Sequence, residues 1–197
     1  MVPDLEAWEA WHPRVLADRL SGVDVPWCVA AGWALDLFRG AQSRAHDDVE
    51  IAVPAARYGA VAERFGDCEF YAVYDGEVWP VSDDTLRAGH QTWARDTATG
   101  KWRLDVFREP HDGDVWICRR DSRIRRPYRE IIEFTADGIP YLTPEIVLLF
   151  KAKGRRDKDE ADFAGVVPML DVGRRTWLDD ALGLVHPAHP WRAVLRS

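Results

Sequence analysis

The spacing of hydrophobic residues changes along the chain, and each change marks a predicted element. Apolar side chains recur at helical spacing between Leu5 and Leu20. The run PWCVAA is continuously apolar and fits a buried strand, and DDVEIAV is a second strand pattern closed by Pro54. The first third of the chain therefore predicts a helix over residues 5–20, a strand over 26–31, a helix over 33–38, a strand over 47–53 and a helix over 55–65.

Between Cys68 and Ile139 the pattern becomes one of short β-type runs separated by turn signals. Helical spacing returns after Thr143, which fits an N-cap ahead of Pro144. Four dipeptides fit hairpins or turns: Asp75-Gly76, Thr99-Gly100, Asp112-Gly113 and Asp137-Gly138. The later helices are predicted over residues 144–153, 157–170 and 174–184.

Together these elements predict an α/β (α+β) fold with a short mixed sheet flanked by helices and a helical C-terminal part. We expect an α/β core over residues 1–140 and a C-terminal helical subdomain over 141–197. The length of 197 residues suits one domain or one domain with a small appendage.

Composition narrows the classes of function. The formal net charge of −7 disfavours nucleic acid as a partner, because nucleic-acid affinity rests mainly on Lys and Arg, and it suits a cationic or small substrate better. No apolar run reaches the ~20 residues of a membrane helix, and the acidic N-terminus does not resemble a signal peptide. The scattered Cys28, Cys68 and Cys118 suggest neither a disulfide framework nor a zinc site. These features predict a cytoplasmic protein that binds no membrane and is a monomer or homodimer.

The residues with the clearest chemistry are three carboxylates in predicted strands. Asp48 and Glu50 are two positions apart, so their side chains point to the same face of a strand. Asp105 lies in the strand-like run WRLDVF, and it joins them if the two strands are neighbours. An acidic pair of this kind is also common on a solvent-facing strand edge.

Such a cluster is costly without a cation, because two unit charges ~4 Å apart repel by about 4 kcal/mol at an effective dielectric near 20. Either the carboxyl groups remain protonated or a cation binds. Oxygen ligands favour hard ions, so the trio Asp48, Glu50 and Asp105 predicts a site for Mg²⁺ or Mn²⁺.

The order of motifs around these residues resembles the DNA polymerase beta-type minimal nucleotidyltransferases, and most of all the aminoglycoside and lincosamide nucleotidyltransferases. That family has a Gly-Gly-Trp-Ala-Leu/Ile-Asp stretch followed by His-x-Asp-x-Asp. The matching segments here are GWALD from Gly32 and RAHDDVE from Arg44. The run YLTPEIVLLFKAKGRRDKDEADF from Tyr141 is similar to a later family helix and Lys-Asp-x-x-Asp motif.

The resemblance covers roughly residues 25–170 and implies roles for individual residues. Asp48 and Glu50 would hold metal, and Asp105 would complete the site and polarise or deprotonate the nucleophile. The remaining implied contacts are to the nucleotide, ATP or another NTP: Gly32, Trp33, Arg44 and Lys151 or Lys153.

Two positions depart from the family pattern. Ala31 stands where the family usually has its first Gly, which makes the phosphate turn less permissive. Glu50 stands where many members have Asp, and its extra methylene moves the oxygen ligand. A catalytically degenerate nucleotide- or ligand-binding module is therefore an alternative to an active enzyme.

Other polar and aromatic residues have competing interpretations. The tryptophans of the β-rich middle, Trp79, Trp93, Trp102 and Trp116, fit core packing better than ligand stacking. Lys158, Asp159 and Asp162 fit local salt bridges as well as a functional motif. Glu109, Asp112 and Asp114 could contact a substrate, although their composition first indicates a loop.

The resemblance implies a metal-dependent nucleotidyltransferase that transfers AMP from MgATP to a hydroxyl of a small molecule. An aminoglycoside or lincosamide antibiotic is the acceptor that the family implies, which would make the protein an antibiotic-resistance factor. A third hypothesis, modification of a macromolecule, depends on a basic patch between Arg119 and Arg129.

Overall fold

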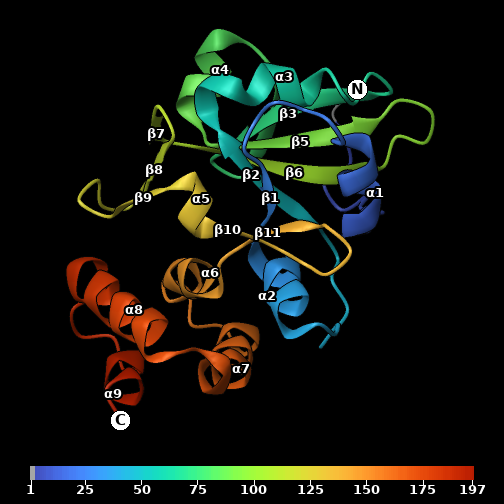
Figure 1. The fold of residues 1–197 in the computed structure, drawn as a ribbon. Coiled ribbons are helices and arrows are strands. Elements are labelled where there is room, and N and C mark those ends of the chain that lie inside the picture. Colours follow the sequence, from blue (N-terminus) through green and yellow to red (C-terminus); the bar gives the residue numbers. More distant parts are fainter. Residues whose placement is uncertain (1–2) are drawn as a thin grey trace.

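The computed structural model describes residues 3–197, and an eight-stranded mixed sheet crosses it in the order β10-β11-β1-β2-β6-β5-β3-β4 (Figure 1). A second sheet has the order β7-β8-β9. The strands of the large sheet are β1 (Cys28–Val29), β2 (Glu50–Pro54), β3 (Cys68–Tyr74), β4 (Glu77–Pro80), β5 (Gln91–Asp96), β6 (Trp102–Glu109), β10 (Ile132–Phe134) and β11 (Pro140–Leu142). Those of the small sheet are β7 (His111–Asp112), β8 (Val115–Ile117) and β9 (Arg125–Pro127).

Helices lie on both sides of this sheet. Figure 1 shows α3 and α4 beyond β3 and β5, whereas α2, α6 and the C-terminal helices lie on the opposite side. The helices are α1 (Pro13–Arg19), α2 (Ala31–Arg39), α3 (Tyr58–Ala62), α4 (Asp83–Ala88), α5 (Tyr128–Ile131), α6 (Pro144–Lys151), α7 (Asp157–Val166), α8 (Val172–Val185) and α9 (Trp191–Leu195). Two 3₁₀ turns, η1 (Ala55–Arg57) and η2 (Val167–Met169), extend α3 and α7. The prediction of a mixed sheet flanked by helices, with a helical C-terminal part, is confirmed.

The parallel strands β2 and β6 lie at the centre of the sheet. Their side chains alternate between a face that packs into the core and a face that carries the carboxylates. Ile51 and Val106 are fully buried and point to one face. Glu50 and Asp105 are paired one position earlier and therefore point to the other face. The same alternation that builds the core thus sets two carboxylates side by side.

The N-terminal helix is shorter than the spacing of its apolar residues predicts. Residues before Pro13 run alongside β6 instead, where Glu9 N donates to Trp102 O at 3.0 Å and Trp11 N donates to Arg103 O at 3.1 Å. Trp102 is completely buried there. Pairing with a strand satisfies the backbone of this segment and partly buries Trp8 and Trp11, so tertiary contacts override the helical spacing.

The turn predictions are confirmed at all four dipeptides. Gly76 and Gly100 have φ values of 78° and 72°, in the left-handed region that favours glycine. The helices α4, α5 and α9 were not predicted, because each is short. Ser82 caps α4 by accepting from Thr85 N, a signal that is clear only once the helix is known.

The C-terminal third is attached to the sheet through β11. Tyr141 on β11 pairs in parallel with Val29 on β1, so the predicted boundary between residues 140 and 141 falls inside a strand. Helix α6 then packs against α2 and α8. The division into two subdomains stays a prediction. Within residues 3–197, no helix has the length and apolar character needed to cross a bilayer.

Candidate active site

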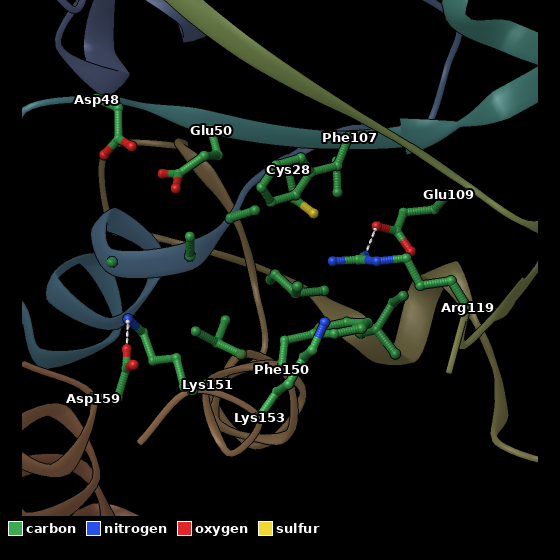
Figure 2. A pocket seen from close by; sticks show the side chains of 18 of the residues that line it. Cys28, Asp48, Glu50, Phe107, Glu109, Arg119, Phe150, Lys151, Lys153 and Asp159 are labelled. Carbon is green, nitrogen blue, oxygen red and sulfur yellow. Dashed lines mark hydrogen bonds and ion pairs between the residues drawn. The ribbon is translucent and has the colours of Figure 1, made fainter. Parts of the chain in front are cut away.

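A cavity of about 410 Å³ lies between the sheet face of β1 and β2 and helix α6 (Figure 2). This volume is within the ~300–1,000 Å³ range of small-molecule sites. The predicted site residues that line it are Gly32, Arg44, Asp48, Glu50, Lys151 and Lys153. Segments far apart in the sequence therefore meet at one site, as the motif order implied.

Asp48 and Glu50 both point into this cavity from its sheet side (Figure 2). Glu50 begins β2, and Asp48 lies in the extended segment just before it. The intervening Val49 is fully buried and points the other way. The predicted same-face arrangement is thus present, although only Glu50 lies inside the strand as the structure defines it.

Asp105 lies directly opposite Glu50 on the adjacent strand β6. It is 5% exposed and does not line the cavity. Gln91 Nε2 donates to its Oδ2 at 2.6 Å, while its Oδ1 is buried without a hydrogen-bond partner among the described residues. Asp105 is therefore adjacent to Glu50, as its predicted role requires. One of its oxygens has no hydrogen-bond partner within residues 3–197.

Burial shifts the protonation of both carboxyl groups. It raises the pKa of Glu50 well above its usual value, and the nearby Asp48 and Asp105 raise it further, while Lys151 opposes the shift. Burial also raises the pKa of Asp105 to about 7, against the hydrogen bond from Gln91. Positive charge at this point of the sheet would favour the ionised forms of both groups.

The donor set fits a hard cation that shares its ligands with a substrate. Within residues 3–197, no three carboxylate, imidazole or thiolate side chains already form an arrangement that could hold a metal ion. Mg²⁺ commonly binds through one or two carboxylates plus substrate phosphates, and Asp48 and Glu50 offer that pair. Asp105 lies beside Glu50 on β6, and its Oδ1 has no hydrogen-bond partner among the described residues.

The turn that leads from β1 into α2 is tightly packed. A Cβ on Gly32 would lie 2.5 Å from Arg44 Nη2 and 2.7 Å from His46 Cε1, so only glycine fits. The preceding Ala31 has a φ of 48°, in the region that favours glycine. The departure from the family pattern at Ala31 therefore falls on a residue whose backbone conformation still suits Gly.

Trp33 and Asp36 on α2 hold the loop that carries Arg44 and His46. His46 stacks on Trp33 with ring centroids 4.6 Å apart, and its Nε2 is 2.7 Å from Asp36 Oδ2. Ser43 Oγ donates to the other oxygen of Asp36 at 2.6 Å. Trp33 is 9% exposed and does not line the cavity. It positions cavity residues in this structure, and its predicted nucleotide contact stays a prediction.

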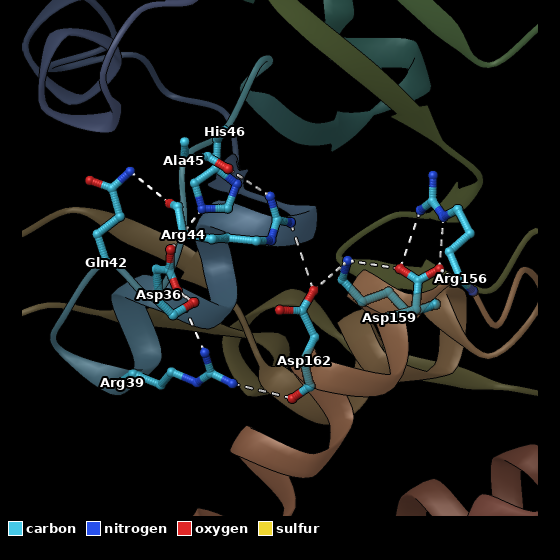
Figure 3. Close-up of polar contacts among 11 residues, drawn as sticks. Asp36, Arg39, Gln42, Arg44, Ala45, His46, Arg156, Asp159 and Asp162 are labelled. Carbon is cyan, nitrogen blue, oxygen red and sulfur yellow. Dashed lines mark hydrogen bonds and ion pairs between the residues drawn. The ribbon is translucent and has the colours of Figure 1, made fainter.

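The family-like Lys and the later acidic motif form one buried ion cluster (Figure 3). Lys151 Nζ is 2.9 Å from Asp162 Oδ2 and 3.2 Å from Asp159 Oδ1. Arg44 Nη2 lies 3.8 Å from Asp162, and Arg156 Nε donates to Asp159 at 2.8 Å. The motif forms local salt bridges, and these salt bridges also position cations that line the cavity, so both the structural and the functional interpretation remain open.

Lys153 differs from Lys151 in that it is exposed and has no ion pair among the described residues. Figure 2 shows it on the wall opposite the carboxylates. Lys158 also lines the cavity, and its positive charge partly opposes the rise in the pKa of Glu50. A group of cations thus faces Asp48 and Glu50 across the cavity.

The other end of the cavity was not predicted from the sequence as part of the site, although Glu109 was named as a possible substrate contact. Phe107 and Glu109 follow Asp105 at alternate positions on β6, so they continue along the same sheet face. Glu109 is 3% exposed; it accepts from Trp116 Nε1 at 3.2 Å and pairs with Arg119 (Figure 2). Its position was detectable only as the second alternate residue after Asp105, in a segment whose composition indicated a loop.

Two of the four tryptophans expected in the core are buried there. Trp102 is completely buried and Trp116 is 2% exposed, although Trp116 also lines the cavity. Trp93 packs edge-on against Trp102, and Trp79 stacks on Tyr74 while remaining 38% exposed.

The basic run between Arg119 and Arg129 is consumed by internal contacts. Arg120 donates to the carbonyls of Leu149 and Phe150 at 2.9 and 2.7 Å, and Arg126 donates to Glu145 at 2.7 Å. Arg125 likewise pairs with Asp112 at 3.2 Å. This run holds segments together and leaves little free charge for a phosphate backbone.

Comparisons with known proteins identify a related family model and similar folds. The family model of aminoglycoside-2''-adenylyltransferase matches residues 14–83. The solution structure of the antibiotic-resistance factor ANT(2'')-Ia is similar over 93% of this chain and 88% of its own, with 14% identity and a TM-score of 0.56. The lincosamide antibiotic adenylyltransferase LnuA, solved with lincomycin bound, is similar over 82% of this chain and 95% of its own, with 15% identity and a TM-score of 0.53. No curated protein sequence matches.

These matches confirm the resemblance to the aminoglycoside and lincosamide nucleotidyltransferases, and they show that the chain has their fold. The matched residues 14–83 include Gly32, Arg44, Asp48 and Glu50.

Proposed function

We propose that the protein is a metal-dependent nucleotidyltransferase that transfers AMP from MgATP to a hydroxyl group of a small molecule. The observation that carries this proposal is the pair Asp48 and Glu50, which faces a group of cations across one cavity and has Asp105 beside it. The structurally similar proteins are named for adenylyl transfer to antibiotics, so an aminoglycoside or a lincosamide is the first acceptor to test.

The proposed reaction is a displacement at the α-phosphorus of ATP. The acceptor oxygen forms a bond to phosphorus, the bond from phosphorus to the bridging oxygen of pyrophosphate breaks, and the hydroxyl proton passes to a base. Asp105 is the proposed base, because it lies opposite Glu50 on the adjacent strand and its Oδ1 has no hydrogen-bond partner among the described residues. The work of the protein is mostly positioning and charge neutralisation, as in phosphoryl transfer generally.

Each end of the triphosphate has proposed protein contacts. Arg44 and Lys153 would neutralise phosphate oxygens, and Gly32 would leave its backbone open to them. Asp48 and Glu50, with Asp105 beside them, would hold Mg²⁺ or Mn²⁺, which when bound would offset phosphate charge. Lys151 would offer a positive charge at a fixed position, because Asp159 and Asp162 hold its ammonium group in place.

The test is calorimetric titration with magnesium and a non-hydrolysable ATP analogue, followed by pyrophosphate release across a panel of hydroxyl acceptors. Glu50→Gln keeps the shape of the side chain and removes the charge, so it should abolish magnesium-dependent binding and turnover. Glu63→Gln is the matched control, because Glu63 is exposed outside the cavity. A folded protein that binds no nucleotide would disprove the proposal, and binding without pyrophosphate release would favour the degenerate module.

A further inference from the structure

The cavity has two chemically different ends, and strand register separates them. Ala30 N donates to Glu50 O at 2.8 Å, which places the turn before Gly32 beside the carboxylates. Cys28 is paired with Ala52, and Ala52 with Phe107, two positions farther along the same strands. The walls beyond Glu50 are therefore apolar, and they end at Glu109 and Arg119 (Figure 2).

A buried hydroxyl without a partner lies at this apolar end. Tyr128 begins α5, is 8% exposed and lines the cavity, and its Oη has no hydrogen-bond partner among the described residues. Burial raises the pKa of this hydroxyl, and Glu109 and Cys28, which also line the cavity, raise it further. Buried hydroxyls are normally hydrogen-bonded, and a ligand atom would satisfy this one.

Arg119 presents a second donor at the same end. Its guanidinium carbon is 4.0 Å from the ring centroid of Phe150 and 5.6 Å from that of Phe107. Its contact with Glu109 fixes one side of the guanidinium. Arg119 and Tyr128 therefore offer N–H and O–H donors between apolar walls, an arrangement that suits an oxygen acceptor on a mainly apolar molecule.

The carboxylates that line the cavity leave none free for a polycation. Asp159 pairs with Lys151 and Arg156, and Glu109 pairs with Arg119. Asp48 and Glu50 are the two that the proposed function assigns to metal. Cationic side chains outnumber carboxylates around the cavity even though the chain as a whole has a net charge of −7. Several ammonium groups would have no counter-charge here.

We propose that the apolar end is the acceptor subsite, and that it takes a mainly apolar hydroxyl compound which presents an accepting oxygen to Tyr128 and Arg119, and not a polycation. This proposal rests on the proposed function. In-line displacement places the entering hydroxyl opposite the leaving pyrophosphate. Gly32 and Arg44 mark the phosphate side of Glu50, so the apolar end is the side from which the hydroxyl enters.

The test uses the anionic aromatic dye anilinonaphthalene sulfonate as a probe of the full-length protein. We expect one saturable site, with dye retained when magnesium and the non-hydrolysable ATP analogue are added. Cys28→Trp fills the apolar end and should abolish dye binding. Ile132→Trp is its matched control, because Ile132 is half-buried in a separate groove that Tyr128 also borders.

Tyr128→Phe keeps the proposal testable if Cys28→Trp fails to fold. Loss of one hydrogen bond should weaken the affinity for the dye by roughly three- to tenfold. Removal of a hydroxyl that has no protein partner should leave the protein at least as stable as the wild type. A structural role for the hydroxyl would lower stability instead, and that result would overturn the proposal.

Three further results would also overturn it. One is that the folded wild-type protein does not bind the dye. Another is that Ile132→Trp abolishes dye binding while Cys28→Trp does not. The third is displacement of the dye by the ATP analogue, which would assign the apolar end to the nucleoside. Pyrophosphate release with the polycation tobramycin would reject the acceptor class while supporting the proposed function. Failure to bind the ATP analogue, with dye binding intact, would reject the proposed function alone.

Discussion

Glu50 and Asp105 face each other across the parallel strands β2 and β6, and burial raises the pKa of both. The pair therefore costs the empty protein stability when it ionises. A bound cation would offset this cost, so the same two carboxylates favour the binding of the cation that the proposed function requires.

The first prediction follows from the sign of the Asp105 shift. Its pKa is raised to about 7 from 3.8, so between these pH values the folded state binds more protons than the unfolded state. Stability should fall as pH rises through this window and level off above it. Asp105→Asn should flatten the fall and add up to about 4 kcal/mol at pH above about 7. Urea unfolding across pH measures this.

Glu50 titrates in the same direction, so some slope should persist in Asp105→Asn. The exposed turn residue Asp75 supplies the control, because Asp75→Asn should leave the wild-type slope unchanged. An unchanged slope in Asp105→Asn would contradict the raised pKa.

The second prediction concerns Gly32. A Cβ at this position would overlap Arg44 Nη2 and the His46 ring, and His46 is held by Asp36 and cannot move freely. Gly32→Ala should lower the free energy of unfolding by roughly 1–3 kcal/mol, as overpacking generally does, and should weaken nucleotide binding.

Gly59 on α3 is the matched control for this substitution, since a Cβ there meets nothing within 4 Å. Gly59→Ala should be neutral or stabilising by up to about 1 kcal/mol. Equal effects of the two substitutions, measured by denaturant unfolding, would exclude a special role for the Gly32 contact.

The third prediction is that Ala31→Gly stabilises the protein. A left-handed conformation costs an L-residue roughly 1–2 kcal/mol, while the greater freedom of unfolded glycine offsets about 0.4–1 kcal/mol. A net gain of about 0.5–1 kcal/mol is expected at this φ of 48°. Ala34→Gly in the same helix should destabilise by about 1 kcal/mol or more, because Ala34 is helical and fully buried. Thermal unfolding of both variants decides the point.

The fourth prediction separates two lysines of the same cavity. Lys151→Met leaves the buried Asp162 with only the 3.8 Å contact to Arg44 and Asp159 with only Arg156, which should cost roughly 3–5 kcal/mol. Lys153→Met should change stability by no more than about 0.5 kcal/mol, since the side chain is exposed. Calorimetry with magnesium and the ATP analogue should instead show weaker binding for Lys153→Met. Normal nucleotide affinity in that variant would remove Lys153 from the proposed site.

Local patterns in the sequence were sufficient to predict the carboxylate end. Period-two alternation placed Asp48 and Glu50 on one side, and turn glycines such as Gly76 marked the hairpins correctly. The adjacency of Asp105 depended on strand order, which no local pattern encodes. The motif predicts Trp33 as a ligand contact, which stays a prediction, whereas its stacking with His46 is a tertiary contact that the motif does not reveal.

The apolar end could not be predicted from local patterns. It is assembled by Cys28 on β1, Phe107 on β6, Tyr128 on α5 and Phe150 on α6, and each of these alone resembles an ordinary core residue. Only the tertiary arrangement shows that they surround a cavity and that no group within residues 3–197 pairs with the Tyr128 hydroxyl. The short helix α4 was missed for a related reason, since a few residues carry too little periodicity to detect.

Asp162 gives the C-terminal third of the chain a direct part in shaping the cavity. One carboxylate on α7 lies against Lys151 at the end of α6 and near Arg44, and the backbone oxygen of the same residue accepts from Arg39 of α2. Helices that meet at a shared counter-ion cannot shift separately without exposing a charge. A chain shortened before Asp157 would therefore lose the anchor of two cavity cations, and so its nucleotide end, even if every residue of the sheet were kept.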